Sequence, residues 1–310
     1  MPREGFEPST SRMRHGAYWK RTASIGIYAA SPTISCMDCF KLHSNSDSKH
    51  ELIRAWVSNL EQKEISDKRV SDYGFSKESK SCWLRQQRPV PIVVLENVNS
   101  SRITGLCVRA GKNICKPPAL TPELAYLAGV ILGDGHVKNY LHPTGYPQHV
   151  IIIEKMRTPY TESYLPQLIK AVFGIRPRVY THKRKSELVR ISVASKIICR
   201  VFTKLLGFSV GKKDDAPVII AEKWPDELKL QFLAGLFDTD GGKSGNSYSL
   251  GNTSRRMIDF AKRLLEKNHI KTRIYTQTFP TSDYWHLYVT QESKTAFQKL
   301  VPVRNRRKFV

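Results

Sequence analysis

The sequence predicts an α+β fold in which one αββαββα unit occurs twice with pseudo-twofold symmetry, preceded by a small helical domain. Two apolar helical segments each end in Asp-Gly, at Asp134 and at Asp240. The stretch 175–181 recurs as 270–276 with its Ile, Arg, Tyr and Thr positions kept, which indicates an internal duplication. Runs of β-branched or alternating residues such as Leu188–Val193 supply the strands between the helices.

Charge and composition indicate which class of molecule the protein binds. The chain of 310 residues has 50 Lys and Arg against 27 Asp and Glu, a net charge of +23. This charge indicates a polyanion, with nucleic acid the leading class. No apolar run reaches the roughly 18 residues of a membrane span. Six cysteines are too few for a disulfide scaffold in a chain of this length, which predicts an intracellular, cytoplasmic protein and leaves an organellar host open.

The first part of the chain predicts a domain distinct from the repeats. Residues 1–50 show no sustained hydrophobic period and predict a poorly structured segment. From Glu51, apolar residues recur at steps of three and four, which predicts an amphipathic helix at the start of a helical domain over 51–98. Residues 99–118 end in Lys-Pro-Pro and predict a linker.

Within that domain, residues 70–85 predict a short helix, a turn at Gly74, an N-cap at Ser76 and a second helix. This pattern resembles the helix-turn-helix of repressor-like proteins, whose second helix enters the major groove with its first turns. The resemblance implies that Ser76, Lys77 and Lys80 face DNA. A helical bundle without DNA contact is the alternative.

The two Asp-Gly helices share an unusual composition. Ala128-Gly129 and Ala234-Gly235 lie inside them, although glycine in a helix interior costs up to ~1 kcal/mol relative to alanine. Close packing of the two backbones at these positions would explain the glycines, and it would bring Asp134 and Asp240 together. Carboxylates about 4 Å apart repel by ~4 kcal/mol at an effective dielectric near 20. A shared divalent cation such as Mg²⁺ offsets that repulsion.

The segments Leu127–Gly135 (LAGVILGDG) and Leu233–Gly241 (LAGLFDTDG) resemble the paired motifs of single-chain LAGLIDADG homing endonucleases. The resemblance covers roughly residues 119–301. It implies a monomer with halves at 119–207 and 208–301 and a basic tail at 302–310. The family hydrolyses phosphodiester bonds with one metal-bound carboxylate per strand. The implied ligands of Mg²⁺ or Mn²⁺ are Asp134 and Asp240, with Gly133 and Thr239 beside them.

The same resemblance implies two catalytic lysines, which stabilise phosphate charge or position water. Lys243 lies three residues after Asp240, and Lys155 directly follows the predicted strand Val150–Glu154. Glu154 departs from the neutral residue frequent in relatives. The mirror position of Lys155 in the second half falls near 253–254, so the two half-sites need not cut equally.

Two predicted strand faces carry side chains that can contact phosphates or read base edges. In the first copy these are Arg176, Arg178, Tyr180, His182 and Arg184, and in the second copy they are Lys271, Arg273, Tyr275 and Gln277. A solvated basic face is the alternative, but the alternation recurs in both copies, which favours DNA binding.

The leading prediction is therefore a site-specific endonuclease for double-stranded DNA, intron-encoded or free-standing. Two alternatives stay open. One is an RNA maturase with intron RNA as its partner, and the other is a DNA-binding regulator that has lost cleavage. Asp134, Asp240 and Lys243 speak against the regulator, because a pure binder gains nothing from clustered acids.

Overall fold

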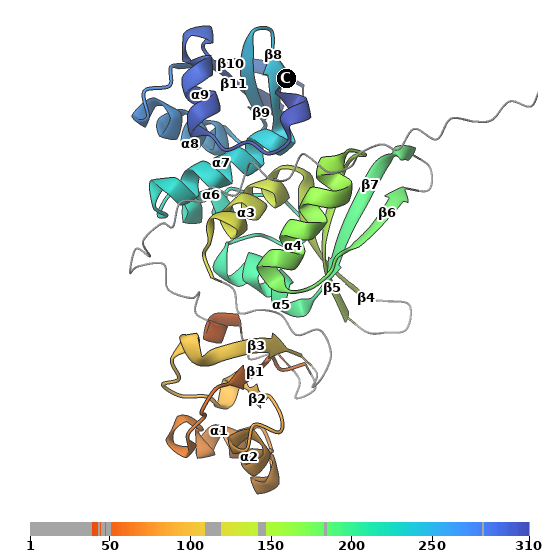
Figure 1. Cartoon of the computed structure of the whole chain (residues 1–310), viewed down its shortest axis with the longest axis vertical. Coiled ribbons are helices and arrows are strands. Elements are labelled where there is room, and N and C mark those ends of the chain that lie inside the picture. Colours follow the sequence, from red (N-terminus) through yellow and green to blue (C-terminus); the bar gives the residue numbers. More distant parts are fainter. Residues whose placement is uncertain are drawn as a thin grey trace, which may run out of the picture. The chain divides into compact units, whose positions relative to one another are not determined.

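The computed structural model describes residues 39–42, 44, 47, 51–108, 119–141, 147–182, 185–280 and 282–309. Within these ranges a small module is followed by two repeated halves (Figure 1). No helix in the described ranges has the length and apolar character needed to cross a membrane.

The small module is mixed, whereas the sequence predicted a helical domain. An antiparallel sheet of order β2-β1-β3 is built from β1 (Arg54–Val57), β2 (Val90–Pro91) and β3 (Ile103–Cys107). The amphipathic helix predicted from Glu51 is wrong, because burial alternates along β1, where Ala55 and Val57 are buried. The predicted linker is also too long at its start, since β3 occupies part of it and pairs with β1.

The two short helices of this module lie close to where the sequence predicted them, although the first begins three residues earlier, at Asp67. They are α1 (Asp67–Asp72) and α2 (Lys77–Leu84). Gly74 adopts a φ of 62° in the turn between them, a conformation that glycine reaches without steric cost. The Ser76 hydroxyl accepts a hydrogen bond from the Ser79 backbone N–H at 3.3 Å, so Ser76 is the N-cap.

The two halves repeat one order of elements. The first contains α3 (Pro122–Asp134), β4 (Gly135–Leu141), β5 (Pro147–Met156), α4 (Leu165–Phe173), β6 (Arg178–His182), β7 (Lys185–Ala194) and α5 (Lys196–Arg200). The second contains α7 (Asp226–Asp240), β8 (Gly241–Ser244), β9 (Ser247–Asn252), α8 (Arg255–Lys267), β10 (Thr272–Phe279), β11 (Ser282–Val289) and α9 (Lys294–Leu300), and α6 (Ala216–Ala221) precedes it. The four-stranded sheets have equivalent orders, β4-β5-β7-β6 and β8-β9-β11-β10. The predicted duplicated α+β fold is confirmed.

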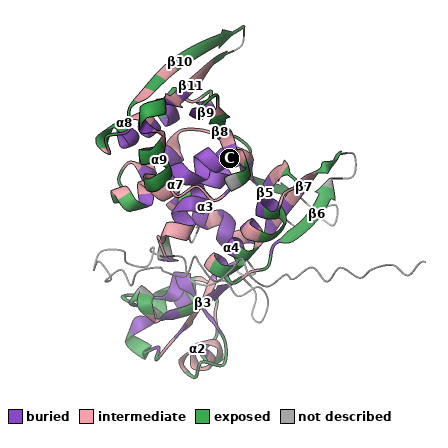
Figure 2. Cartoon of the chain, turned by 45° about the horizontal axis from the view of Figure 1, so that its top comes forward, coloured by how far each residue is buried: buried purple, intermediate pink, exposed green. Residues whose placement is uncertain are grey.

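The helices α3 and α7 pack against each other along their small residues, and both are largely buried (Figure 2). A Cβ at Gly129 would lie 2.0 Å from the carbonyl oxygen of Phe232, and a Cβ at Gly235 would lie 2.2 Å from that of Tyr126. The two contacts are equivalent, as in a two-fold interface where each side presents the same patch. The close approach predicted from the Ala-Gly pairs is confirmed.

Part of the segment predicted to be poorly structured is ordered against the first half. A 3-10 turn, η1, spans Cys39–Leu42. The buried carboxylate of Asp47 accepts hydrogen bonds from Lys196 Nζ at 2.8 Å and from Arg200 Nη2 at 2.5 Å. Arg200 Nη1 also donates to the carbonyl oxygen of Leu42 at 2.9 Å. The prediction is wrong for these residues because charge pairing with α5 orders them, and residues 1–38 lie outside the described residues.

Candidate active site at the paired helix ends

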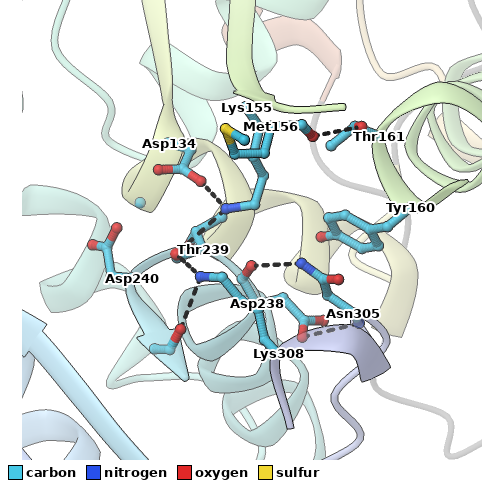
Figure 3. Close-up of polar contacts among 12 residues, drawn as sticks. Asp134, Lys155, Met156, Tyr160, Thr161, Asp238, Thr239, Asp240, Asn305 and Lys308 are labelled. Carbon is cyan, nitrogen blue, oxygen red and sulfur yellow. Dashed lines mark hydrogen bonds and ion pairs between the residues drawn. The ribbon is translucent and has the colours of Figure 1, made fainter. Parts of the chain in front are cut away.

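The two predicted catalytic carboxylates meet where α3 and α7 end. Asp134 is the last residue of α3 and Asp240 the last of α7 (Figure 3). A Cβ at Gly133 would lie 3.3 Å from Oδ1 of Asp240, which shows how near the second helix end comes to the first. Burial and then the negative charge of Asp134 raise the pKa of Asp240. The charge of Asp134 therefore opposes ionisation of Asp240.

Lys155 and Asn252 occupy equivalent places beside the two acids. Gly135 pairs with Ile153 in the first sheet, and Gly241 pairs with Leu250 in the second. Ile153 and Leu250 are therefore equivalent, and so are Lys155 and Asn252, which lie two residues after them. Lys155 Nζ forms an ion pair with Asp134, and Asn252 Nδ2 donates to Oδ2 of Asp240 at 2.8 Å. The sequence analysis had placed the equivalent of Lys155 at 253–254, which is one or two residues after Asn252. A cation thus accompanies Asp134 and a neutral amide accompanies Asp240.

Two further lysines reach the helix ends, and the sequence reasoning missed both. Lys213 Nζ donates to the carbonyl oxygen of Gly133, and Lys308 Nζ donates to that of Thr239 and, at 2.8 Å, to that of Gly241. The two lysines are separated by the same 95 residues that separate the repeats at 175 and 270, so this offset could have found them. Burial and the nearby charge of Lys155 lower the pKa of Lys308 to about 8.

Two residues singled out in the sequence lie away from the acids. Lys243 is on β8 with an exposed side chain, and no hydrogen bond or ion pair joins it to Asp134 or Asp240 in the described part of the chain. Glu154 forms an ion pair with Arg190 on the neighbouring strand β7. The structure thus brings Lys155 to the acids and leaves Lys243 and Glu154 outside their contacts.

The oxygen atoms at the helix ends fit a hard divalent cation. The carboxylates of Asp134 and Asp240 and the carbonyl groups of Gly133 and Thr239 are the oxygen donors that Mg²⁺ or Mn²⁺ prefers. Burial and then the charge of Asp134 raise the pKa of Asp240, and a shared dication would offset both effects. Among the described residues there is no group of three or more His, Cys, Asp or Glu side chains suited to a metal. Because the carbonyl oxygens of Gly133 and Thr239 already accept from Lys213 and Lys308, a metal would rest mainly on the two carboxylates and water.

The predicted DNA-contacting residues lie mainly on the outer strands of the two sheets, which are exposed in Figure 2. Arg178, Tyr180 and His182 belong to β6, and Arg273, Tyr275 and Gln277 belong to β10. Arg176 and Lys271 precede these strands and are exposed. Arg184 lies outside the described residues. The Arg190 guanidinium lies 5.8 Å from the centre of the Tyr180 ring.

An aromatic row on β11 lies beside the β10 residues and was not anticipated. Tyr284, His286 and Tyr288 pair with Gln277, Tyr275 and Arg273 in the sheet register. The Tyr284 and His286 rings lie 4.8 Å apart, and those of His286 and Tyr288 lie 6.0 Å apart. The alternation Tyr-x-His-x-Tyr was a visible signal. This row therefore continues the face formed by Arg273, Tyr275 and Gln277 onto the neighbouring strand.

The residues predicted to face DNA in the small module differ in their exposure. Lys77 is exposed at the start of α2. Ser76 is exposed and caps the helix. Lys80 forms an ion pair with Asp67 of α1, and its side chain is largely covered. Of the three, Lys77 is the clearest candidate for a phosphate contact.

Comparison with known proteins relates part of the chain to a known family. Residues 227–302 match the family model of a LAGLIDADG-like domain. Over 158 residues, or 50% of the chain, the sequence is 28% identical to uncharacterized protein MJ0398 of Methanocaldococcus jannaschii, and it spans about half (52%) of that relative's length. A structure of I-DmoI with DNA and Mn aligns over 59% of this chain and 97% of its own, with 16% identity and a TM-score of 0.48. Full-length DUF199/WhiA from Thermatoga maritima aligns over 60% of this chain and 56% of its own, with 13% identity and a TM-score of 0.38.

The family match covers the second half, from the start of α7 to the end of α9. The first half repeats the same order of elements and the same Asp-Gly helix end. The resemblance read from the two motifs is thereby confirmed, and residues 227–302 match a LAGLIDADG-like domain.

Proposed function

We propose that this protein is a site-specific endonuclease that hydrolyses both strands of double-stranded DNA with the help of Mg²⁺ or Mn²⁺. One observation carries the proposal, namely that Asp134 and Asp240 converge at the ends of two closely packed helices. Each acid lies at the negative end of a helix dipole, and the two repel each other. A protein that merely binds DNA has no use for this arrangement, whereas phosphodiester hydrolysis has.

The chain's own residues divide into two sets of similar composition. Asp134 has Lys155 on its carboxylate and Lys213 on the preceding carbonyl group. Asp240 has Asn252 on its carboxylate and Lys308 on the preceding carbonyl group. We assign one set to each DNA strand, because the sets come from equivalent positions of the two halves. As both sets lie in one chain, the active species is a monomer.

The roles of these groups follow from their charge. A lysine ammonium close to the scissile phosphate stabilises negative charge that develops on its oxygens and can orient the attacking water. Asp134 and Asp240 are the residues that would hold the cation. Such a cation supplies Lewis-acid stabilisation of the phosphate and a more acidic water.

DNA recognition is assigned to the exposed strands of the two sheets. Arg178 and Tyr180 on β6 correspond to Arg273 and Tyr275 on β10, so both halves offer a cation and an aromatic ring at matching positions. Arginine reads guanine and glutamine reads adenine in the major groove, which makes Gln277 a second candidate for base contact. The net charge of +23 supplies the general attraction to phosphates. Lys77 would add a contact outside the cleaved site.

The test is cleavage of a randomised library of double-stranded DNA in Mg²⁺, with sequencing of the ends. We expect defined double-strand breaks from the unaltered protein. Asp134→Asn and Asp240→Asn should each lower cleavage by about 100-fold or more while DNA binding persists. Asp226→Asn is the matched control, because this acid lies on α7 and pairs with Lys229 and Lys267 instead.

Two results would overturn the nuclease proposal. DNA binding without cutting in either Mg²⁺ or Mn²⁺ would favour a regulator. Preferential binding of intron RNA, with acceleration of its splicing, would favour a maturase.

A further inference from the structure

We propose that residues 301–309 form a C-terminal strap, and that Asp238 positions Lys308 for cleavage by holding this strap in place. The sequence had predicted a basic tail from residue 302, but Asn305 is buried and Arg304 and Lys308 are half-buried. The inference rests on the proposed nuclease function, which makes Lys308 a catalytic residue, so one arm of the test below does not depend on cleavage.

The attachment of the strap centres on one buried carboxylate. Asp238 lies on α7 and is completely buried. Its Oδ2 accepts a hydrogen bond from the Arg304 backbone N–H at 2.7 Å, and its Oδ1 accepts one from the Asn305 backbone N–H at 3.1 Å. The Asn305 side chain donates to the Asp238 carbonyl oxygen at 3.4 Å. Two main-chain amides on a carboxylate fix the direction of the strap, because such charge-assisted bonds are short and directional.

Arg304 anchors the strap to both halves of the molecule. Its guanidinium lies 4.0 Å from the centre of the Tyr126 ring on α3. Its Nη2 donates to Gln231 Oε1 on α7 at 2.8 Å. The Tyr126 hydroxyl in turn donates to Asp238 at 2.5 Å, so α3, α7 and the strap share one polar network.

Lys308 is held between this anchor and an aromatic contact. Its backbone N–H donates to the Asn305 carbonyl oxygen at 3.0 Å, and the Phe309 ring lies 5.3 Å from the Tyr248 ring. Between these points the Lys308 side chain reaches the carbonyl oxygens of Thr239 and Gly241 (Figure 3). The Asp238 bonds therefore determine where Lys308 enters the site.

The first half shows that this fold does not require an acid at the Asp238 position. The helix offset of 106 residues that relates Asp134 to Asp240 relates Leu132 to Asp238, and Leu132 is a buried apolar residue. The segment before Lys213 is instead held by a parallel bridge between Val137 and Val210 and by the Gly211 N–H on the Val137 carbonyl oxygen at 2.8 Å. A buried carboxylate is costly unless its oxygens are bonded. Holding the strap accounts for its presence in α7.

The first arm of the test measures the strap itself. Hydrogen exchange by mass spectrometry on the full-length protein follows the peptide that contains Arg304 and Asn305. Asp238→Asn should speed exchange of this peptide by about tenfold or more, because asparagine keeps only one acceptor oxygen, so one of the two backbone N–H groups loses its acceptor and meets an NH2 group instead. Asp226→Asn, the same change on the same helix, should leave it unchanged. If Asp238→Asn does not fold, the same measurement is made on Asp238→Leu, which introduces the residue type found at the equivalent position 132 of the first half. Unchanged exchange in a folded variant would overturn the proposal.

The second arm asks whether the strap acts through Lys308. Single-turnover cleavage is compared for Asp238→Asn, Lys308→Met and the double variant, with each DNA strand labelled. We expect both single variants to slow the same strand with little change in DNA affinity, and the double variant to be no slower than Lys308→Met. Multiplied defects, or equal slowing of both strands by Asp238→Asn, would indicate a general structural role and overturn the proposal. If the unaltered protein does not cut DNA, the proposed function fails, and the exchange arm still decides the attachment.

Discussion

At the scale of single residues, Gly129 and Gly235 determine how closely α3 and α7 approach. Each glycine faces a carbonyl oxygen of the other helix, so neither a flexible side chain nor a solvent gap can absorb an added methyl group. The distance between Asp134 and Asp240 follows from this contact, because both acids are the last residues of the same helices.

We predict that Gly129→Ala or Gly235→Ala destabilises the protein by about 2–3 kcal/mol, because overpacking against backbone cannot be relieved by a rotamer change. Chemical denaturation measures the loss. Gly242→Ala is the control, since the nearest neighbour of a Cβ there would be the Lys308 carbonyl oxygen, at 4.0 Å. Equal stability of Gly129→Ala and Gly242→Ala would contradict the close-packed helix contact.

The sequence predicted the acids and Lys155 because these residues lie in or next to a recognisable local pattern. Lys213 and Lys308 were missed because each is far in sequence from the carbonyl group that it contacts, and no local sequence pattern predicts such a contact. Asp238 was also missed as a structural residue, since a lone acid in a motif helix gives no hint that residues 304 and 305 bond to it.

At the scale of secondary-structure elements, β1 shows where hydrophobic spacing misleads. The residues from Leu52 to Leu60 satisfy helical spacing, but Ala55 and Val57 also satisfy the alternation of a strand. Pairing with β3, which lies far along the chain, stabilises the strand over the helix. By contrast, α2 was predictable because Ser76 caps it with a hydroxyl group in the expected place, and the Thr121 hydroxyl caps α3 in the same way.

The contact between η1 and α5 gives a prediction that depends on pH. Burial opposes ionisation of Asp47, but Arg200 and Lys196 outweigh it and lower the pKa of this carboxyl below its ordinary value. The stabilisation should therefore be complete above about pH 4 and be lost as the pH falls through the lowered pKa. Asp47→Asn should cost about 3 kcal/mol at neutral pH, because it leaves two cations poorly compensated.

Urea unfolding of the unaltered protein and of Asp47→Asn, from neutral pH down to about pH 3, measures this difference. Asp259→Asn is the control, since its partner Arg255 is half-exposed and such pairs contribute less than about 1 kcal/mol. A difference that stays constant down to the lowest pH would show that the Asp47 charge is not the cause.

At the scale of the whole molecule, the two halves keep one architecture but differ in chemistry. Lys155 corresponds to Asn252, and Leu132 corresponds to Asp238. The shared topology was predictable because it rests on repeated patterns of apolar residues. The differences were not, because they depend on single polar contacts within an otherwise equivalent frame.

The net charge of +23 predicts that DNA binding is strongly salt-dependent. If six or more phosphates are contacted, affinity should fall by about a thousandfold between 50 and 200 mM salt. Fluorescence anisotropy over this range gives the slope. Lys77→Ala should lower the slope by about one if this residue contacts a phosphate. A slope near zero would exclude phosphate contacts as the main source of affinity.

The assignment of one set of residues to each strand is tested by strand-resolved cleavage of a selected site with Lys213→Met and Lys308→Met. We expect each variant to slow one strand by about 100-fold, with a different strand affected in each case and DNA affinity nearly unchanged. If both variants slow the two strands alike, or if neither changes the rate on either strand, then the two halves do not act as separate catalytic centres.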